Sequence, residues 1–382
     1  MLQLPAVAVN VLILSSRFPW PSFTGDRLRA TIWLSALEHQ AEVALVAPRG
    51  DVPPNAPRFR FYPAPSSPMR GITRAFRVAG GAPVHSLLAA PYDWSSAIER
   101  ATKDAGTFDA TIVLLSRLDP WVRDSLPKGL HVLDAIDSLR GSMAERAREA
   151  SPLTRWFWRE ESRRVERAER EAVAAYDRVV VVSGRESSEL DALAISNGVD
   201  IAPLGDSPRA FDFGFWGRLA YFANADATSW LLDEIWPAIR AQRPGATLII
   251  AGADAPARIR AAHGRDGIVV QTPVDDIATL ARGITVALFP VRYGTGQSNK
   301  VLEAAEAACA IVATQTAMRG LPELEPHASI ANDSTTFAAS ALAAISDAGK
   351  AGAALRAVVE AKYARQTMLA RLAAIVDRKA AA

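Results

Sequence analysis

The regular alternation of short aliphatic runs with longer helical patterns is the feature that most constrains the fold. Runs rich in Val, Ile and Leu recur through both halves of the chain, separated by stretches with helical spacing of apolar residues. This alternation is typical of consecutive βαβ units with parallel sheets. The expected strands are about 7–14, 42–47, 110–115, 131–135 and 178–182, then 211–216, 247–251, 268–270, 286–289 and 311–313. A helix is expected at 226–243, with apolar residues facing the core at helical spacing and with Pro237 kinking or splitting it.

The interval between these two sets of strands marks a boundary between two Rossmann-like halves. Glycine and proline interrupt any periodicity at 198–208, where a hinge could form. A chain of 382 residues, 49 % of them hydrophobic, is long enough to bury two cores. We therefore expect an α/β protein with domains at 1–203 and 204–358 and a helix at 359–382. Ligands should bind at the carboxyl ends of both sheets.

The segment 286–303 (VALFPVRYGTGQSNKVLE) carries the strongest chemical signal. An apolar strand enters a loop that contains Gly294 and Gly296, and a helix follows at once. Glycines let a ligand approach the backbone, and Gln297 and Ser298 can present free amides at the positive end of the helix dipole. This pattern predicts a phosphate site.

Lys300 and Glu303 add two charged groups to the predicted site. They lie three residues apart on the helix and therefore share a face. Lys300 could neutralise a diphosphate, while the carboxylate of Glu303 could accept two hydrogen bonds from a ribose diol. The alternative is an ordinary surface pair. Because the chain meets nearly all its need for positive charge with arginine, a lysine beside a glycine loop favours the phosphate site.

The stretch GTGQSNKVLEAAEAACAIVAT resembles the donor-site segment of GT-B glycosyltransferases, particularly the sugar transferases of bacterial exopolysaccharide and PEP-CTERM systems. Four further pieces match that group in order: 15–29 (SSRFPWPSFTGDRLR), 132–138 (VLDAIDS), 197–200 (NGVD) and 216–221 (WGRLAY). The resemblance covers most of the chain. It implies two Rossmann-like domains that face a cleft, with a last helix that crosses back to the first domain.

The resemblance also assigns roles in the second domain. Arg218 would reach the diphosphate together with Lys300, and its alternative is a surface salt bridge. Thr272 and Val274 would hold the nucleobase, although an ordinary turn explains them equally well. Thr295 would join the glycine loop at the donor.

In the first domain, candidate residues follow two predicted strands. Gly25 and Asp26 lie in the loop after the first strand, and Asp134 and Asp137 accompany a later one. An aspartate there could take the proton of an acceptor hydroxyl if burial raises its pKa. Asp137 also resembles in position the catalytic aspartate of the glucuronosyltransferase of xanthan assembly. Alternatively, Asp137 or Ser138 only caps a helix.

The chain departs from the family pattern at several positions. Thr295 stands where the broader retaining family has glutamate, no lysine follows Arg218, Thr272 replaces a glycine, and Ala308-Cys309 replaces a glycine turn. These changes are compatible with nucleotide binding. They leave inverting and retaining chemistry open.

Composition and the remaining motifs restrict the partners. A net charge of +2 gives no pull toward nucleic acid, and the single Cys309 suits a reducing compartment. The five histidines are scattered, so no metal site is expected. The segments 152–170 and 69–78 interleave apolar and basic residues, which predicts either contact with the inner face of a membrane or a solvated helix with a packed aromatic end.

Together these observations predict a cytoplasmic hexosyl- or glucuronosyltransferase. Its donor would be a nucleotide diphosphate sugar, most simply UDP-linked, and its acceptor a lipid-linked or glycan molecule in exopolysaccharide assembly. No cofactor or metal would be needed. The alternatives are a noncatalytic nucleotide-sugar-binding partner of an assembly complex, which the missing glutamate at Thr295 favours, and a sugar-nucleotide epimerase of the same architecture.

Overall fold

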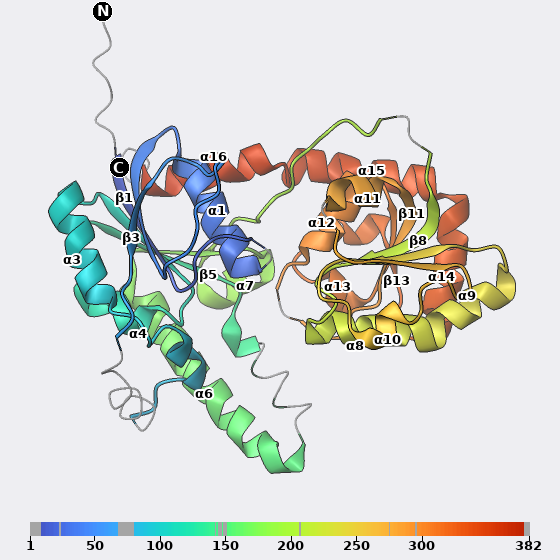
Figure 1. Cartoon of the computed structure of the whole chain (residues 1–382), viewed down its shortest axis with the longest axis horizontal. Helices are drawn as coiled ribbons and strands as arrows, with labels where there is room; N and C mark the ends of the chain where they lie inside the picture. The colour runs from blue at the N-terminus through green and yellow to red at the C-terminus, as the bar shows by residue number, and fades with distance from the viewer. Residues whose placement is uncertain are drawn as a thin grey trace, which may run out of the picture. The chain divides into compact units, whose positions relative to one another are not determined.

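A computed structural model describes residues 9–22, 24–67, 80–141, 143, 147, 151–205, 208–274, 276–294 and 296–377. The chain forms two compact units, and each has its own parallel sheet (Figure 1). The first unit comprises Met1–Ser196 and Met368–Ala382, and the second comprises Asn197–Thr367. The predicted α/β class with two Rossmann-like sheets is therefore confirmed.

The first unit is built on a seven-stranded sheet in the order β3-β2-β1-β4-β5-β6-β7. Its central strands are buried along most of their length, as expected for a parallel sheet covered on both faces. The chain order reverses between β1 and β4, which places the usual ligand-binding edge at their carboxyl ends. The strands are β1 (Val9–Ser15), β2 (Ala41–Ala47), β3 (Arg60–Pro63), β4 (Ala110–Leu114), β5 (Leu130–Ile136), β6 (Arg178–Val181) and β7 (Leu193–Ala194).

Helices cover both faces of this sheet. One core contains Trp33 of α1 together with strand residues such as Val11, and the other contains Trp94 of α3 and Ala172 of α6. The helices are α1 (Gly25–Leu37), α3 (Trp94–Ala105), α4 (Asp119–Val122), α6 (Pro152–Ala175) and α7 (Gly184–Leu190), with short 3-10 turns at Val84–Leu88 and Arg123–Ser125.

The last helix, α16 (Arg365–Val376), returns to the first unit. Met368, Leu372 and Ile375 lie in the same core as Trp33. Arg371 donates to the carbonyl oxygen of Ala194 at 2.8 Å, which fixes the helix beside the edge of the sheet. The predicted crossover of the C-terminal helix is thus confirmed.

The second unit has a six-stranded sheet in the order β10-β9-β8-β11-β12-β13 around a single large core. The strands are β8 (Phe211–Trp216), β9 (Leu248–Ala251), β10 (Ile268–Gln271), β11 (Ile284–Phe289), β12 (Ala310–Ala313) and β13 (Ser329–Ile330). Its helices are α8 (Phe222–Trp230), α9 (Trp236–Gln242), α10 (Ala257–Arg260), α11 (Ile277–Arg282), α12 (Asn299–Glu306), α13 (Gln315–Met318), α14 (Ser334–Ser346) and α15 (Ala348–Lys362), with a 3-10 turn at Glu325–His327.

The helix predicted at 226–243 is split in the way its proline suggests. A π-helical turn at Leu231–Ile235 separates α8 from α9, and Pro237 lies in the first turn of α9. The wider π turn accommodates Pro237, which has no backbone N–H to donate to the preceding turn. The apolar residues expected to face the core are buried: Ala227, Trp230, Leu231, Ile235 and Ile239.

Asp134 of β5 is a structural residue at the centre of the first unit. Its Oδ2 accepts hydrogen bonds from Nε of Arg29 at 2.7 Å and from Nε1 of Trp33 at 2.6 Å. The side chains of Asp134 and Arg29 are both fully buried. A carboxylate enclosed by a guanidinium and an indole has no path to an acceptor, so Asp134 is not the catalytic base considered above.

We expect Asp134→Ala to destabilise the protein strongly, because it leaves the Arg29 guanidinium buried without its counter-charge. Breaking one side of a buried pair costs about 3–5 kcal/mol. Thermal unfolding monitored by circular dichroism measures the effect. Glu189→Ala is the matched control, since Glu189 forms only exposed pairs with Arg140 and Arg185 and should change stability by less than about 1 kcal/mol. Equal melting temperatures for the two variants would contradict this role.

Candidate functional site

The glycine loop between β11 and α12 contains one position whose backbone conformation favours glycine. Gly294 adopts φ +134, and a Cβ built there would meet no atom within 4 Å. Ser298 precedes α12 in an extended conformation and its side chain makes no capping hydrogen bond. The amides of the first turn are therefore not satisfied by that hydroxyl and can meet an anion. Gly296, Gln297 and Ser298 are half-buried, and Thr295 lies outside the described residues.

The ammonium of Lys300 is fixed by a side chain from another helix. Its Nζ donates to Oδ1 of Asn224, and it lies 4.8 Å from the centroid of the Phe215 ring. Asn224 in turn donates from Nδ2 to the carbonyl oxygen of Arg218 at 2.9 Å. Gly217 makes room for this pair, because a Cβ there would lie 2.9 Å from Nδ2 of Asn224 and 3.3 Å from Nζ of Lys300. The cation is held in one place before any ligand arrives.

Burial lowers the pKa of Lys300 to about 8, although the charge of Glu303 acts in the opposite direction. The ammonium is therefore incompletely solvated at neutral pH. Such a group gains more from an incoming anion than a fully hydrated lysine does, because less water must be removed from it.

Glu303 lies one turn further along α12 and is oriented by the end of β8. Its Oε2 accepts from Nε1 of the buried Trp216 at 2.8 Å. Burial raises the pKa of Glu303, while Trp216, Lys300 and Arg365 oppose that rise. Within the described part of the chain, Oε1 of Glu303 has no hydrogen-bond partner. One carboxylate oxygen is thus used for positioning and the other remains for a ligand.

The C-terminal end of α12 is anchored by buried charge. Glu306 is 2 % exposed and pairs with Arg282 at 3.2 Å and with Arg356 at 3.3 Å. Its carboxylate also accepts from the amide of Ala202, whose carbonyl oxygen accepts from Arg356 at 2.8 Å. Arg209 adds hydrogen bonds to the carbonyl oxygens of Ala307 and Ala308. These contacts fix the axial position of the helix that carries Lys300 and Glu303.

Two contacts that the sequence did not suggest close the glycine loop against the segment after α13. Arg319 donates to the carbonyl oxygen of Gly294 at 3.0 Å, and Gln297 donates to that of Gly320 at 3.1 Å. Gln297 therefore acts through its side chain as well as its backbone. The dipeptide Arg319-Gly320 directly follows the short helix α13. Its arginine and glycine were the signal in the sequence that could have marked this segment.

The other predicted residues of the second unit lie at strand ends but make few distinctive contacts. The Arg218 guanidinium, about half-exposed, pairs through Nε with Oδ2 of Asp254 at 2.8 Å. This is the surface salt bridge that was its alternative, so a ligand would have to compete with Asp254. Thr272 and Val274 follow β10, where Val274 packs partly on the core.

Asp26 of the first unit is an ion-paired carboxylate at the start of α1, next to Gly25. It accepts from Thr24 at 2.7 Å and from Arg117 at 2.6 Å, and it lies 3.4 Å from Arg17. Burial alone would raise its pKa, but Thr24 and the two arginines outweigh burial and lower it. Asp26 therefore stays ionised and is a weak base, better suited to holding Arg117 in place.

Asp137 lies beside two further acidic residues at the carboxyl end of β5. Glu186 accepts from the amide of Ser138 at 2.9 Å, and Glu169 accepts from the amide of Leu139 at 2.6 Å and from Oγ of Ser138 at 2.9 Å. Burial and the nearby charge of Asp137 raise the pKa of Glu186 to about 8. The two glutamates thus bind the first backbone amides after Asp137, and Asp137 itself is half-buried.

No metal centre accompanies these residues in the described ranges, where no group of three His, Cys, Asp or Glu side chains could hold an ion. The same ranges contain no helix long and apolar enough to cross a bilayer.

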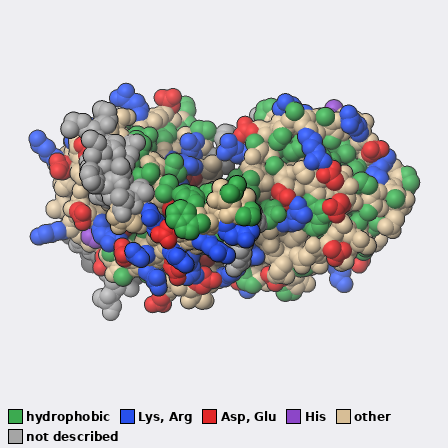
Figure 2. Space-filling view, turned by 90° about the horizontal axis from the view of Figure 1, so that it is seen from below, with side chains coloured by type: hydrophobic (Ala, Val, Ile, Leu, Met, Phe, Trp, Pro, Cys, Tyr) green, Lys and Arg blue, Asp and Glu red, His purple; other side chains and the backbone are tan. Residues whose placement is uncertain are grey.

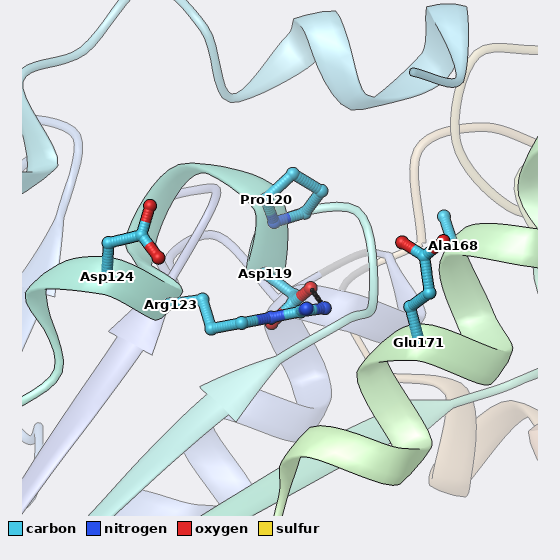
Figure 3. Close-up of a pocket in the computed structure, with 6 residues that line it drawn as sticks. All are labelled: Asp119, Pro120, Arg123, Asp124, Ala168 and Glu171. Atoms are coloured by element: carbon cyan, nitrogen blue, oxygen red, sulfur yellow. Dashed lines mark hydrogen bonds and ion pairs between the residues drawn. The ribbon is translucent and has the colours of Figure 1, made fainter. Parts of the chain in front are cut away.

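A small open pocket lies elsewhere on the first unit, between α4 and α6 (Figure 3). Its Arg123 is already paired with Asp119, and it contains none of the predicted residues. The pocket is lined by Asp119, Pro120, Arg123, Asp124, Ala168 and Glu171.

Known proteins similar to this chain have a common architecture. Among solved structures, a sucrose-phosphate synthase from Thermosynechococcus elongatus superposes with a TM-score of 0.71 at 14% identity, covering 96% of this chain and 98% of that one. HepE from Anabaena, solved in complex with UDP, gives 0.65 at 13% identity, covering 96% and 99%. WaaG, described as a glycosyltransferase involved in lipopolysaccharide biosynthesis, gives 0.62 at 13% identity, covering 97% and 100%. At such identities the likeness shows the fold.

Sequence comparison adds the family of the second unit. No curated protein is significantly similar to the chain by sequence. Residues 210–347 match the family model described as "Glycosyl transferases group 1", and this range contains β8, the glycine loop and α12. The second unit thus matches a group 1 glycosyltransferase model over these residues, and the chain as a whole has the GT-B fold of the structures named above.

Proposed function

We propose that this protein is a glycosyltransferase that moves a sugar from a UDP-linked donor to a lipid-linked or glycan acceptor in the assembly of exopolysaccharide or another cell-surface polysaccharide. One observation carries the proposal. Lys300 lies in the first turn of α12 beside the glycine loop, and Asn224 of α8 holds its ammonium group. The UDP in the complex of the structurally similar HepE supports the choice of nucleotide.

The donor diphosphate would bind at the start of α12. The amides there, the helix dipole and the Lys300 ammonium all favour negative charge, which grows on the leaving diphosphate as the bond to the sugar breaks. The arrangement meets that charge with protein groups, so we propose transfer without a metal cofactor. Glu303 would bind the ribose hydroxyls through Oε1, with Trp216 holding its other oxygen.

The acceptor would be activated in the first unit. In an inverting transfer, the acceptor oxygen forms a bond to the anomeric carbon, the bond from that carbon to the diphosphate breaks, and the acceptor proton passes to a base. We propose Asp137 as that base. Glu186 and Glu169 hold the segment that follows it, through the amides of Ser138 and Leu139.

The first prediction from this proposal concerns the pH dependence of UDP binding. Lys300 is charged below its pKa, so affinity should be highest below pH 8 and should fall as the pH rises through about 8. Lys300→Ala should lose on the order of 1.5–3 kcal/mol of UDP-binding free energy at neutral pH. The UDP affinity of this variant should change little as the pH rises through about 8. Isothermal titration calorimetry measures both effects. Lys350→Ala, at an exposed lysine of α15, is the control and should behave like the parent protein.

A second prediction separates the ribose from the diphosphate. Glu303→Ala should weaken binding of UDP and of uridine alike, by roughly 1–3 kcal/mol, because the lost contact is to the ribose. Lys300→Ala should weaken only UDP. The ratio of the two affinities, measured by competition against a fluorescent nucleotide, is the readout. Uridine binding that is unaffected by Glu303→Ala would remove the ribose role, and Glu360→Ala serves as the exposed control.

A third prediction tests Asp137. Asp137→Asn keeps the shape of the side chain and removes the proton acceptor, so turnover should fall by roughly a hundredfold or more while UDP affinity is unchanged. UDP released in the presence of acceptor measures turnover. Near-normal turnover in the folded variant would exclude Asp137 as the base and would favour a retaining mechanism assisted by the donor phosphate. Glu189→Gln, at an exposed residue of α7, is the control.

A further inference from the structure

Helix α6 has a free N-terminal end whose apolar side chains are exposed. Leu153 is 94 % exposed, Trp156 76 % and Phe157 40 %. Their spacing of three and four residues places them on neighbouring positions of the first two turns. The helix is buried only from Glu161 onward, through Val165, Glu169 and Ala172. The aromatic end is therefore not packed into the core, contrary to one of the two interpretations of this segment.

A row of arginines continues from Trp156 along the solvent side of the same helix. Arg159, Arg163, Arg167 and Arg170 follow Trp156 at intervals of three, four, four and three residues, which keeps them on one face. All four are exposed. The buried residues of α6 recur at similar intervals on the opposite face. Figure 2 shows basic side chains gathered around hydrophobic ones on this side of the first unit.

The acidic residues of α6 do not neutralise this row. Glu161 accepts hydrogen bonds from the amides of Val84 and His85, and Glu169 accepts from Ser138 and Leu139, so both point into the unit. Glu160 pairs with Arg164 at 3.1 Å and lies 3.7 Å from Arg163. Glu166 lies 3.7 Å from Arg140, and the exposed Glu171 lines the pocket between α4 and α6. Arg159, Arg167 and Arg170 have no carboxylate partner among the residues that the structure describes. The exposed face is therefore positively charged.

We propose that this face of α6, formed by Leu153, Trp156, Phe157 and the four arginines, adsorbs to an anionic lipid bilayer. Tryptophan and leucine enter the headgroup region, while guanidinium groups bind lipid phosphates, often through two hydrogen bonds. A protein partner fits less well. A fully buried aromatic residue contributes about 150–250 Å², so three apolar side chains fall short of the roughly 800 Å² that each partner of a stable complex buries.

Co-sedimentation of the full-length protein with lipid vesicles tests this surface. Binding to vesicles that contain phosphatidylglycerol should exceed binding to pure phosphatidylcholine at least about tenfold, and it should weaken as salt is added. Replacing Arg159 or Arg167 by Gln should lower the partition coefficient about fivefold for each arginine. The control Arg49→Gln changes an exposed arginine elsewhere on the first unit and should have a much smaller effect.

The apolar part of the surface needs separate variants. The double variant Leu153→Ser, Trp156→Ser should lose most vesicle binding while its thermal unfolding stays unchanged, because both side chains are exposed. Leu193→Ser, at a leucine that is 51 % exposed on β7, is the matched control. Trp156→Phe should keep binding but lose the part of the tryptophan fluorescence that brominated lipids quench.

Three results would overturn the proposal: no preference of the parent protein for anionic vesicles, equal losses in the controls, or conversion of a dimer into a monomer by the double variant. The last result would identify the face as a contact between protein molecules. None of these measurements uses sugar transfer, so they stand or fall independently of the proposed function.

Discussion

The second unit is organised around the fixed position of one short helix. Helix α12 is held at its C-terminal end by Glu306, which is buried between two arginines, and at its N-terminal end Lys300 is bonded to Asn224. Burying a charge is costly unless it is paired, so each of these contacts admits few alternative geometries. The position of this helix sets the positions of the glycine loop before it, the Lys300 ammonium and Glu303. The phosphate site that we propose here would need little rearrangement when a ligand arrives, which is the condition for electrostatic stabilisation of a leaving group.

The sequence was sufficient to predict most strands of both sheets and the split at Pro237, and the resemblance supplied the returning helix. The strands and the split depend on apolar periodicity and on proline, which act over a few residues. The strands β7 and β13 were missed because they have only two residues each, and β3 was missed because Arg60–Pro63 contains no aliphatic run. Ala308 illustrates a different case: it adopts φ +52 where the related pattern has glycine, so the left-handed backbone is retained despite the substitution. The backbone of Gly352 packs closely against this turn, since a Cβ at Gly352 would lie 2.0 Å from the carbonyl oxygen of Ala308.

Contacts between residues far apart in the chain could not be predicted from the sequence. Asp134 lies in β5 and Asp137 directly follows this strand, yet Asp134 is neutralised by Arg29, which is 105 positions away, whereas Asp137 lies among glutamates. Trp216 matched the family segment by sequence, but its contact to Glu303, like that of Asn224 to Lys300, depends on how β8 and β11 pair. Local patterns point to candidate residues. The surroundings that set their pKa values are assembled only by the complete fold.

The return of α16 also determines when each unit can be completed during synthesis. The second unit is one continuous stretch of chain, whereas the first unit includes Met368, Leu372 and Ile375, which follow the second unit in the sequence. Domains usually fold as they leave the ribosome, in order from the N-terminus. Here the first unit is synthesised first, but its apolar face stays uncovered until α16 is made. The second unit is completed before that. The nascent protein is therefore most exposed to aggregation, and most dependent on chaperones, in its N-terminal half.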